Sequence, residues 1–188
     1  MTTQVEPAVD PHQDKRDFIQ KYWNALMEGD METFATLVHP DCVVHYPGNH
    51  FLSGDHVGKP AILQLYESLY RIGLQQGTFV GEWHDTVTSD GHVCALIAYT
   101  LELGAGQRLT GEAIGVFHLE DGQMIEYWLL ERDQKLINDI FALSGKATLE
   151  KGGSKAALAV SALTHPLALI RTARRVVRQK RGVNTKML

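Results

Sequence analysis

Four long segments between residues 78 and 132 are apolar or alternate apolar and polar residues, and short turns separate them. They cover residues 78–88, 92–103, 108–119 and 124–132. Ser89-Asp90-Gly91, Gly104-Ala105-Gly106 and Glu120-Asp121-Gly122 stand between them, and such glycine-containing segments suit hairpin turns. The pattern predicts a meander of long antiparallel strands, which must bury one face against something else.

Helical segments precede the predicted meander and can supply that cover. Apolar residues recur at spacings of three and four over 14–28, a shorter helix is expected at 31–38, and Pro60 suits the first turn of a helix at 60–72. A short strand at 42–46 lies among them, and 133–143 is expected to begin as a closing helix. Three helices followed by antiparallel strands predict an α+β fold, with a curved sheet folded around the helices.

Charge divides the chain unevenly. Residues 1–143 carry 8 Lys and Arg against 21 Asp and Glu, whereas residues 144–188 carry 10 against 1. We expect a disordered lead at 1–13, a domain at 14–143, a linker at 144–163 and a basic amphipathic helix or tail at 164–188.

In the predicted tail helix, apolar residues and arginines lie on opposite arcs. Leu169, Ile170, Ala173, Val176 and Val177 share one arc, and Arg171, Arg174, Arg175, Arg178 and Arg181 share the other. Residues 164–181 could therefore bind an anionic membrane surface or an acidic partner, or fold back on the acidic body of the same chain. Nucleic acid is not an expected partner, because the tail lacks aromatic residues to stack on bases.

The sequence favours a cytoplasmic protein. The basic tail leaves open that this protein also binds a membrane surface peripherally. The first 14 residues lack the apolar core of a signal peptide, and no stretch approaches the ~20 apolar residues of a membrane span. Cys42 and Cys94 each sit in a strand-like run and are expected to be buried, inert thiols. The histidines show no ligand spacing, so no metal is expected. The glycines at 54 and 58 lack the Lys-Ser/Thr pair of a nucleotide-binding loop, and no other cofactor is expected either.

Three short motifs link these elements to a known family. They are Val44-His45-Tyr46-Pro47-Gly48, Glu126-Tyr127-Trp128, and the closing segment Asp133-Gln134 to Asp139. In this order they resemble the SnoaL-like and ketosteroid-isomerase-like group of the nuclear-transport-factor-2 superfamily, over about residues 15–142. The resemblance implies a cone-shaped curved antiparallel sheet around the three N-terminal helices, with a deep apolar pocket. It also implies a homodimer through the outer face of the sheet.

The ketosteroid isomerases of this group use a Tyr, an Asp base and a second, protonated Asp. In this chain the resemblance places Tyr22 at the position of the Tyr, but Tyr46 stands at the position of the base and Gly115 at that of the second Asp. Ketosteroid isomerisation is therefore not expected, since no carboxylate is left to abstract the proton.

SnoaL-like polyketide cyclases are the closer resemblance, and they use an acidic residue near the end of the last strand. Glu126, Glu131 and Asp133 are the candidates in this chain, and His45 is an alternative general base because its ordinary pKa is close to neutral. In a regular strand, Met124, Glu126 and Trp128 share a face, so Glu126 would face the pocket if Trp128 does. Tyr22 and Glu126 could instead have structural roles and take no part in the reaction.

The expected pocket is apolar with a few polar groups. Its predicted lining consists of aromatic residues and one glycine: Trp23, Phe51, Trp83, Gly115, Phe117 and Trp128. Such a site suits a cofactor-independent enzyme that moves protons on a hydrophobic polyketide-, steroid- or terpenoid-like molecule, by isomerisation, cyclisation or hydration. The alternative is a non-catalytic module of the same fold that binds a lipophilic ligand or a protein.

Overall fold

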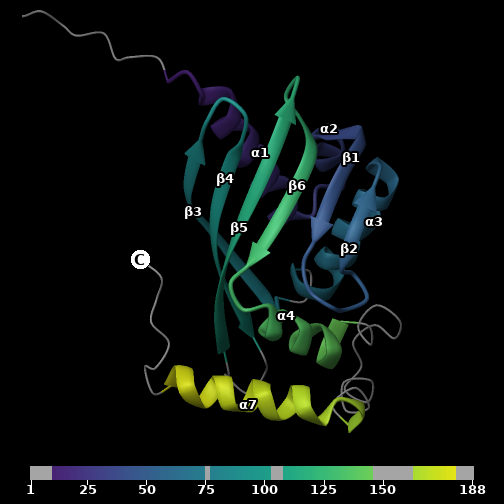
Figure 1. The fold of residues 1–188 in the computed structure, drawn as a ribbon, viewed down its shortest axis with the longest axis vertical. Coiled ribbons are helices and arrows are strands. Elements are labelled where there is room, and N and C mark those ends of the chain that lie inside the picture. The colour runs from purple at the N-terminus through teal and green to yellow at the C-terminus, as the bar shows by residue number, and fades with distance from the viewer. Residues whose placement is uncertain (1–9, 75–76, 103–107, 146–162, 181–188) are drawn as a thin grey trace, which may run out of the picture.

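The computed structural model describes residues 10–74, 77–102, 108–145 and 163–180. Most of the predicted lead and linker, and the end of the predicted tail, lie outside these ranges. Within them the chain has the predicted α+β fold, with helices packed on one face of a curved, open sheet (Figure 1).

The N-terminal helices are α1 (Gln13–Glu28), α2 (Met31–Thr36) and α3 (Lys59–Leu69), the last continued by a π-helical turn η1 (Tyr70–Leu74). Helix α1 buries Phe18, Ile19 and Tyr22, which belong to its predicted apolar stripe, together with Ala25. It ends at Gly29, whose φ of 70° is the left-handed conformation that glycine adopts without strain. Asp30 then caps α2 by accepting a hydrogen bond from the Thr33 N–H.

The six strands are β1 (Val38–Tyr46), β2 (Gly54–Val57), β3 (Phe79–Thr88), β4 (Val93–Glu102), β5 (Arg108–Glu120) and β6 (Gln123–Glu131). Their order in the sheet is β2-β1-β6-β5-β4-β3. The meander β3 to β6 is confirmed, but the sheet is not wholly antiparallel, because β1 and β6 run parallel. Strand β2 was not predicted, since its four residues resembled only a turn leading into α3.

A bulge in β6 reverses the side-chain pattern that a regular strand would have. His118 pairs with Glu126 and Leu119 pairs with Met124, so Ile125 is the extra residue. Because one extra residue moves all later side chains to the opposite face, Met124 is buried in the core while Glu126 and Trp128 lie on the outer face. Tyr127, Leu129 and Glu131 consequently point toward the helices.

Helix α4 (Gln134–Ile140), its π-helical continuation η2 (Phe141–Gly145) and α7 (Pro166–Lys180) lie at the end of the sheet where β5 begins and β6 ends (Figure 1). Helix α7 lies within the segment expected to form the tail, and it packs against α4 and β5. Within the described ranges, no helix has the combination of length and apolar character needed to cross a membrane.

Candidate functional site

A cavity of about 610 Å³ lies between the inner face of the sheet and the helices. Strands β4, β5 and β6 form one wall, and α1, α3, η1, α4 and α7 contribute the others. Most of the lining is apolar, with Leu26, Leu69, Ile72, Ile97, Leu129 and Ile140 among its members. The volume is in the range of pockets that enclose drug-sized molecules.

Five tyrosines bring hydroxyl groups to this apolar cavity: Tyr22, Tyr46, Tyr66, Tyr99 and Tyr127. The hydroxyl oxygens of Tyr22 and Tyr66 lie 2.6 Å apart and hydrogen-bond to each other. Burial raises the pKa of each of the five well above the ordinary value for tyrosine. All of them are therefore neutral and able to donate a hydrogen bond at physiological pH.

Glu131, the last residue of β6, brings a carboxylate to the same cavity. Burial raises its pKa and the Asp133 carboxylate adds to the rise, whereas the neighbouring Tyr99 hydroxyl and the backbone N–H of Asp133 oppose it. That N–H donates to Oε1 of Glu131 over 3.2 Å. The result is a fixed carboxyl group whose protonated form is favoured relative to a glutamate in water.

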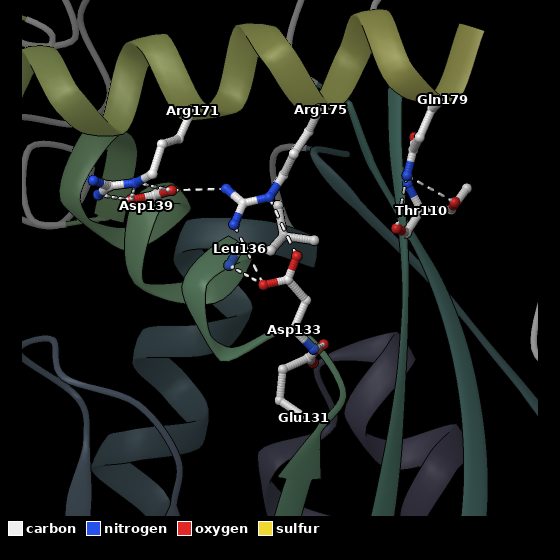
Figure 2. Close-up of polar contacts among 8 residues, drawn as sticks. All are labelled: Thr110, Glu131, Asp133, Leu136, Asp139, Arg171, Arg175 and Gln179. Atoms are coloured by element: carbon white, nitrogen blue, oxygen red, sulfur yellow. Dashed lines mark hydrogen bonds and ion pairs between the residues drawn. The ribbon is translucent and has the colours of Figure 1, made fainter. Parts of the chain in front are cut away.

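Helix α7 forms the remaining wall through Leu169, Thr172, Ala173 and Val176. Ionic contacts hold it in place (Figure 2). Arg171 binds the Asp139 carboxylate through two nitrogens, and Nη1 of Arg175 donates to Oδ2 of Asp139 over 2.7 Å. Asp139 is only 2% exposed, and although burial raises its pKa, the two guanidiniums outweigh this and lower it.

Two further contacts position α7 along its length. Arg175 also reaches the Asp133 carboxylate, and Gln179 donates to the backbone oxygen of Thr110 at the start of β5 (Figure 2). Asp133 itself caps α4 by accepting from the Leu136 N–H over 3.0 Å. The structure thus places predicted catalytic residue Asp133 outside the cavity lining, where it links α4 to α7.

His45 and Glu126 lie together on the outer face of the sheet, away from the cavity. His45 contacts Asp55 through Nδ1 at 2.7 Å and Glu126 through Nε2 at 3.1 Å, and its ring stacks on Trp128. Burial lowers the pKa of His45, but the two carboxylates outweigh this and raise it. The prediction that Glu126 and Trp128 face the pocket is wrong, because the β6 bulge turns them outward.

The other predicted site residues divide between the cavity and its surroundings. Tyr22, Tyr46 and Trp23 line the cavity as predicted, whereas Phe51 is 42% exposed and stands outside its lining. Trp83 also lies outside, with its indole N–H bonded to Oγ1 of Thr86 over 2.7 Å.

Two residues on β5 support the tyrosines from behind instead of lining the cavity. Phe117 is fully buried, with its ring centroid 4.9 Å from that of Tyr22. A Cβ at Gly115 would approach the Tyr127 ring to 2.9 Å and the Phe117 ring to 3.0 Å. Gly115 therefore makes room for two aromatic rings. Gly115 and Phe117 were predicted to contact substrate, but the geometry favours a supporting role for both.

Sequence reasoning did not single out Tyr66, Tyr99, Tyr127 or the α7 wall as parts of the site. The first three could have been found from the periodicity of their helix and strands, but only with the correct register. Among the residues that the structure describes, no cluster of three His, Cys, Asp or Glu side chains is arranged to hold a metal ion.

Comparison with known proteins agrees with this fold. Residues 19–127 match the family model described as a SnoaL-like domain. Bal32a, from a soil-derived mobile gene cassette, is 26% identical, with a TM-score of 0.58 over 66% of this chain and 94% of its own. A protein of unknown function with a cystatin-like fold from Xanthomonas campestris is 27% identical, with a TM-score of 0.55 over 63% and 91%.

IdmH, a proposed polyketide cyclase from Streptomyces antibioticus, shares 20% identity and a TM-score of 0.53 over 64% of this chain and 93% of its own. Curated proteins gave no match. The matched family region ends at residue 127, before Glu131, α4 and α7.

Proposed function

The chain belongs to the SnoaL-like domain family, and we propose that it is a cofactor-independent enzyme that moves protons on a hydrophobic, oxygen-bearing molecule. The substrate class is polyketide-, steroid- or terpenoid-like, and the reaction is an isomerisation, cyclisation or hydration. The observation that carries this proposal is Glu131, a fixed carboxyl group of raised pKa in an apolar cavity lined by neutral tyrosines.

Glu131 is proposed as the general acid and base. A carboxylate desolvated by an apolar cavity is a stronger base than one in water, and its protonated form can return the proton to another atom of the same substrate. The Asp133 N–H donates to Oε1 and thereby helps to hold the carboxyl group in place at the cavity.

The tyrosine hydroxyls are proposed to stabilise negative charge on a substrate oxygen. Proton abstraction beside a carbonyl creates an enolate, and neutral donors already positioned in a dry cavity stabilise that charge more than water does. Tyr22 and Tyr66 form one hydrogen-bonded pair that could rearrange to donate, and Tyr99 lies next to Glu131.

Relatives of the same fold support the substrate class. IdmH is a proposed polyketide cyclase, and TerC, 14% identical with a TM-score of 0.55 over 63% of this chain and 91% of its own, was crystallised with polyporic acid. These assignments belong to those proteins. The apolar lining and volume of the cavity in this chain are compatible with a molecule of several fused or linked rings.

The test is proton exchange at the carbon beside the carbonyl of 2-tetralone in D₂O, followed by NMR. We expect saturable exchange above the buffer rate, and a loss of about 100-fold or more in Glu131→Gln, the usual scale for removing a general base. Glu126→Gln is the matched control, because it removes a carboxylate from the outer face of the same strand and should leave exchange unchanged.

The outcomes separate the alternatives. Loss of exchange in Glu126→Gln but not in Glu131→Gln would contradict the assignment of the base. Binding of 2-tetralone with no exchange in the wild-type protein would favour the non-catalytic ligand-binding module. The hydrogen bond between Tyr22 and Tyr66, which gives each hydroxyl a partner without a ligand, is compatible with that alternative. The predicted homodimer and cytoplasmic location stay predictions.

A further inference from the structure

Two buried hydroxyl groups in the cavity have no hydrogen-bond partner. Tyr99 is 5% exposed and Thr172 is 6% exposed, and both line the cavity. Their hydroxyls are two of three buried side-chain polar atoms without a partner in the part of the chain that the structure describes, the third being Nε2 of His50. A buried hydroxyl without a partner costs desolvation free energy, so such a group usually hydrogen-bonds to a water molecule or a ligand.

Thr172 faces the cavity because of how α7 docks. Ala168, Thr172 and Val176, spaced one turn apart, are the buried positions of the helix. A threonine inside a helix commonly donates to the carbonyl four residues earlier, which in α7 is that of Ala168, but Thr172 does not. Arg171, Arg175 and Gln179 bind the body from neighbouring positions and prevent α7 from turning Thr172 toward solvent (Figure 2).

Tyr99 is fixed by its ring. The ring lies directly over Gly111 of β5, where a Cβ would come within 2.1 Å of it, and it stacks on Phe79 at a centroid distance of 5.5 Å. Its hydroxyl is near enough to Glu131 to influence the pKa of that carboxyl group, but it forms no hydrogen bond of acceptable geometry with it. Tyr99 and Val176 also belong to one buried cluster, which places the tyrosine at the α7 end of the cavity.

We propose that Tyr99 and Thr172 form a binding subsite for an uncharged oxygen, a hydroxyl or a carbonyl, carried by the otherwise apolar ligand. The inference rests on the proposed function and narrows its substrate class. A ligand hydroxyl or carbonyl can hydrogen-bond to either side chain, whereas a ligand carboxylate near Tyr99 would be repelled by a charged Glu131. Thr172 lies outside the matched family region, so this subsite is a specificity feature that α7 adds to the common fold.

The experiment compares two fluorescent probes of nearly equal shape, 1-hydroxypyrene and 1-methylpyrene. Wild-type protein should bind 1-hydroxypyrene about 3- to 10-fold more tightly, which corresponds to one net hydrogen bond. Thr172→Val, of similar size, should weaken binding of 1-hydroxypyrene by a similar factor and leave 1-methylpyrene unchanged. Val177→Thr, the reverse exchange at a 47% exposed position of α7, is the control and should change neither affinity.

Tyr99→Phe should also weaken binding of 1-hydroxypyrene and leave binding of 1-methylpyrene unchanged. This second variant excludes the explanation that Thr172→Val acts only by disturbing the helix. Equal affinities of the wild-type protein for the two probes, or equal losses for both probes in Thr172→Val, would overturn the subsite while leaving the apolar cavity and the role of Glu131 intact. Binding of neither probe would overturn the subsite, and 2-tetralone exchange would then decide whether the proposed function stands. The 2-tetralone exchange assay separates these failures, because it reports on Glu131 and not on Thr172.

Discussion

Replacing Arg175 by Gln should release α7 from the body without unfolding the sheet. Arg175 is 18% exposed and reaches two carboxylates, the nearly buried one of Asp139 and the half-exposed one of Asp133. A hydrogen bond between charged groups contributes about 1.5–3 kcal/mol. An exposed ion pair adds about 0.2–1 kcal/mol. The substitution should therefore cost about 2–3 kcal/mol in α7 docking.

Hydrogen–deuterium exchange of α7 backbone amides measures this cost directly. Since 1.36 kcal/mol corresponds to a factor of ten, the amides of α7 should exchange about 30- to 150-fold faster in Arg175→Gln, while those of β4 and β5 keep their rates. Arg178→Gln removes the same charge from an exposed position of the same helix and should have little effect. Equal exchange in the two variants would refute the reasoning and show that apolar contacts alone hold α7.

Three further predictions concern other parts of the molecule. Because the pKa of His45 is raised in the folded protein, the protonated side chain stabilises the fold below about pH 6.5. This stabilisation is lost as the pH rises through the folded-state pKa. In urea unfolding curves, His45→Gln should remove this pH dependence. Gly115→Ala should cost about 1–3 kcal/mol because its Cβ would press on two buried rings, whereas Gly91→Ala, with open space around it, should cost far less; thermal unfolding checks both. Binding of α7 to an anionic membrane is one of the alternatives that the sequence left open. If its exposed face binds anionic vesicles, Arg174→Glu with Arg178→Glu should abolish salt-sensitive co-sedimentation, and unchanged pelleting would end that idea.

The fold was predictable because its signals are local and repeated. Glycine turns fixed the strand limits of the meander to within about a residue or two, and the stripe on α1 fixed its buried face. The parallel pairing of β1 with β6 was not predictable from local pattern, since the two strands are more than 70 residues apart and each would suit either direction. The same holds for β2, which depends on its neighbour for its hydrogen bonds.

The site was less predictable because one extra residue in β6, Ile125, reverses which side chains of the strand face the cavity. Counting by twos from Met124 gives Glu126 and Trp128 an inward direction, and the bulge at Ile125 sends them outward. Bulges have no reliable sequence signal, so the cavity carboxylate could be narrowed only to Glu126, Glu131 or Asp133. In α7, the opposed arcs suggested a helix with one apolar and one cationic side, but docking uses the border between them, where Thr172 lies.

Asp133 connects the two features that sequence reasoning assigned separately, the acidic site and the basic tail. Its backbone N–H donates to Glu131, and its carboxylate both caps α4 and receives Arg175 of α7. Because the charge of Asp133 helps raise the pKa of Glu131, a guanidinium that pairs with Asp133 moderates that effect. Seating α7 therefore does two things at once: it completes the cavity wall that carries Thr172, and it adjusts the electrostatic setting of the carboxyl group proposed to move the proton.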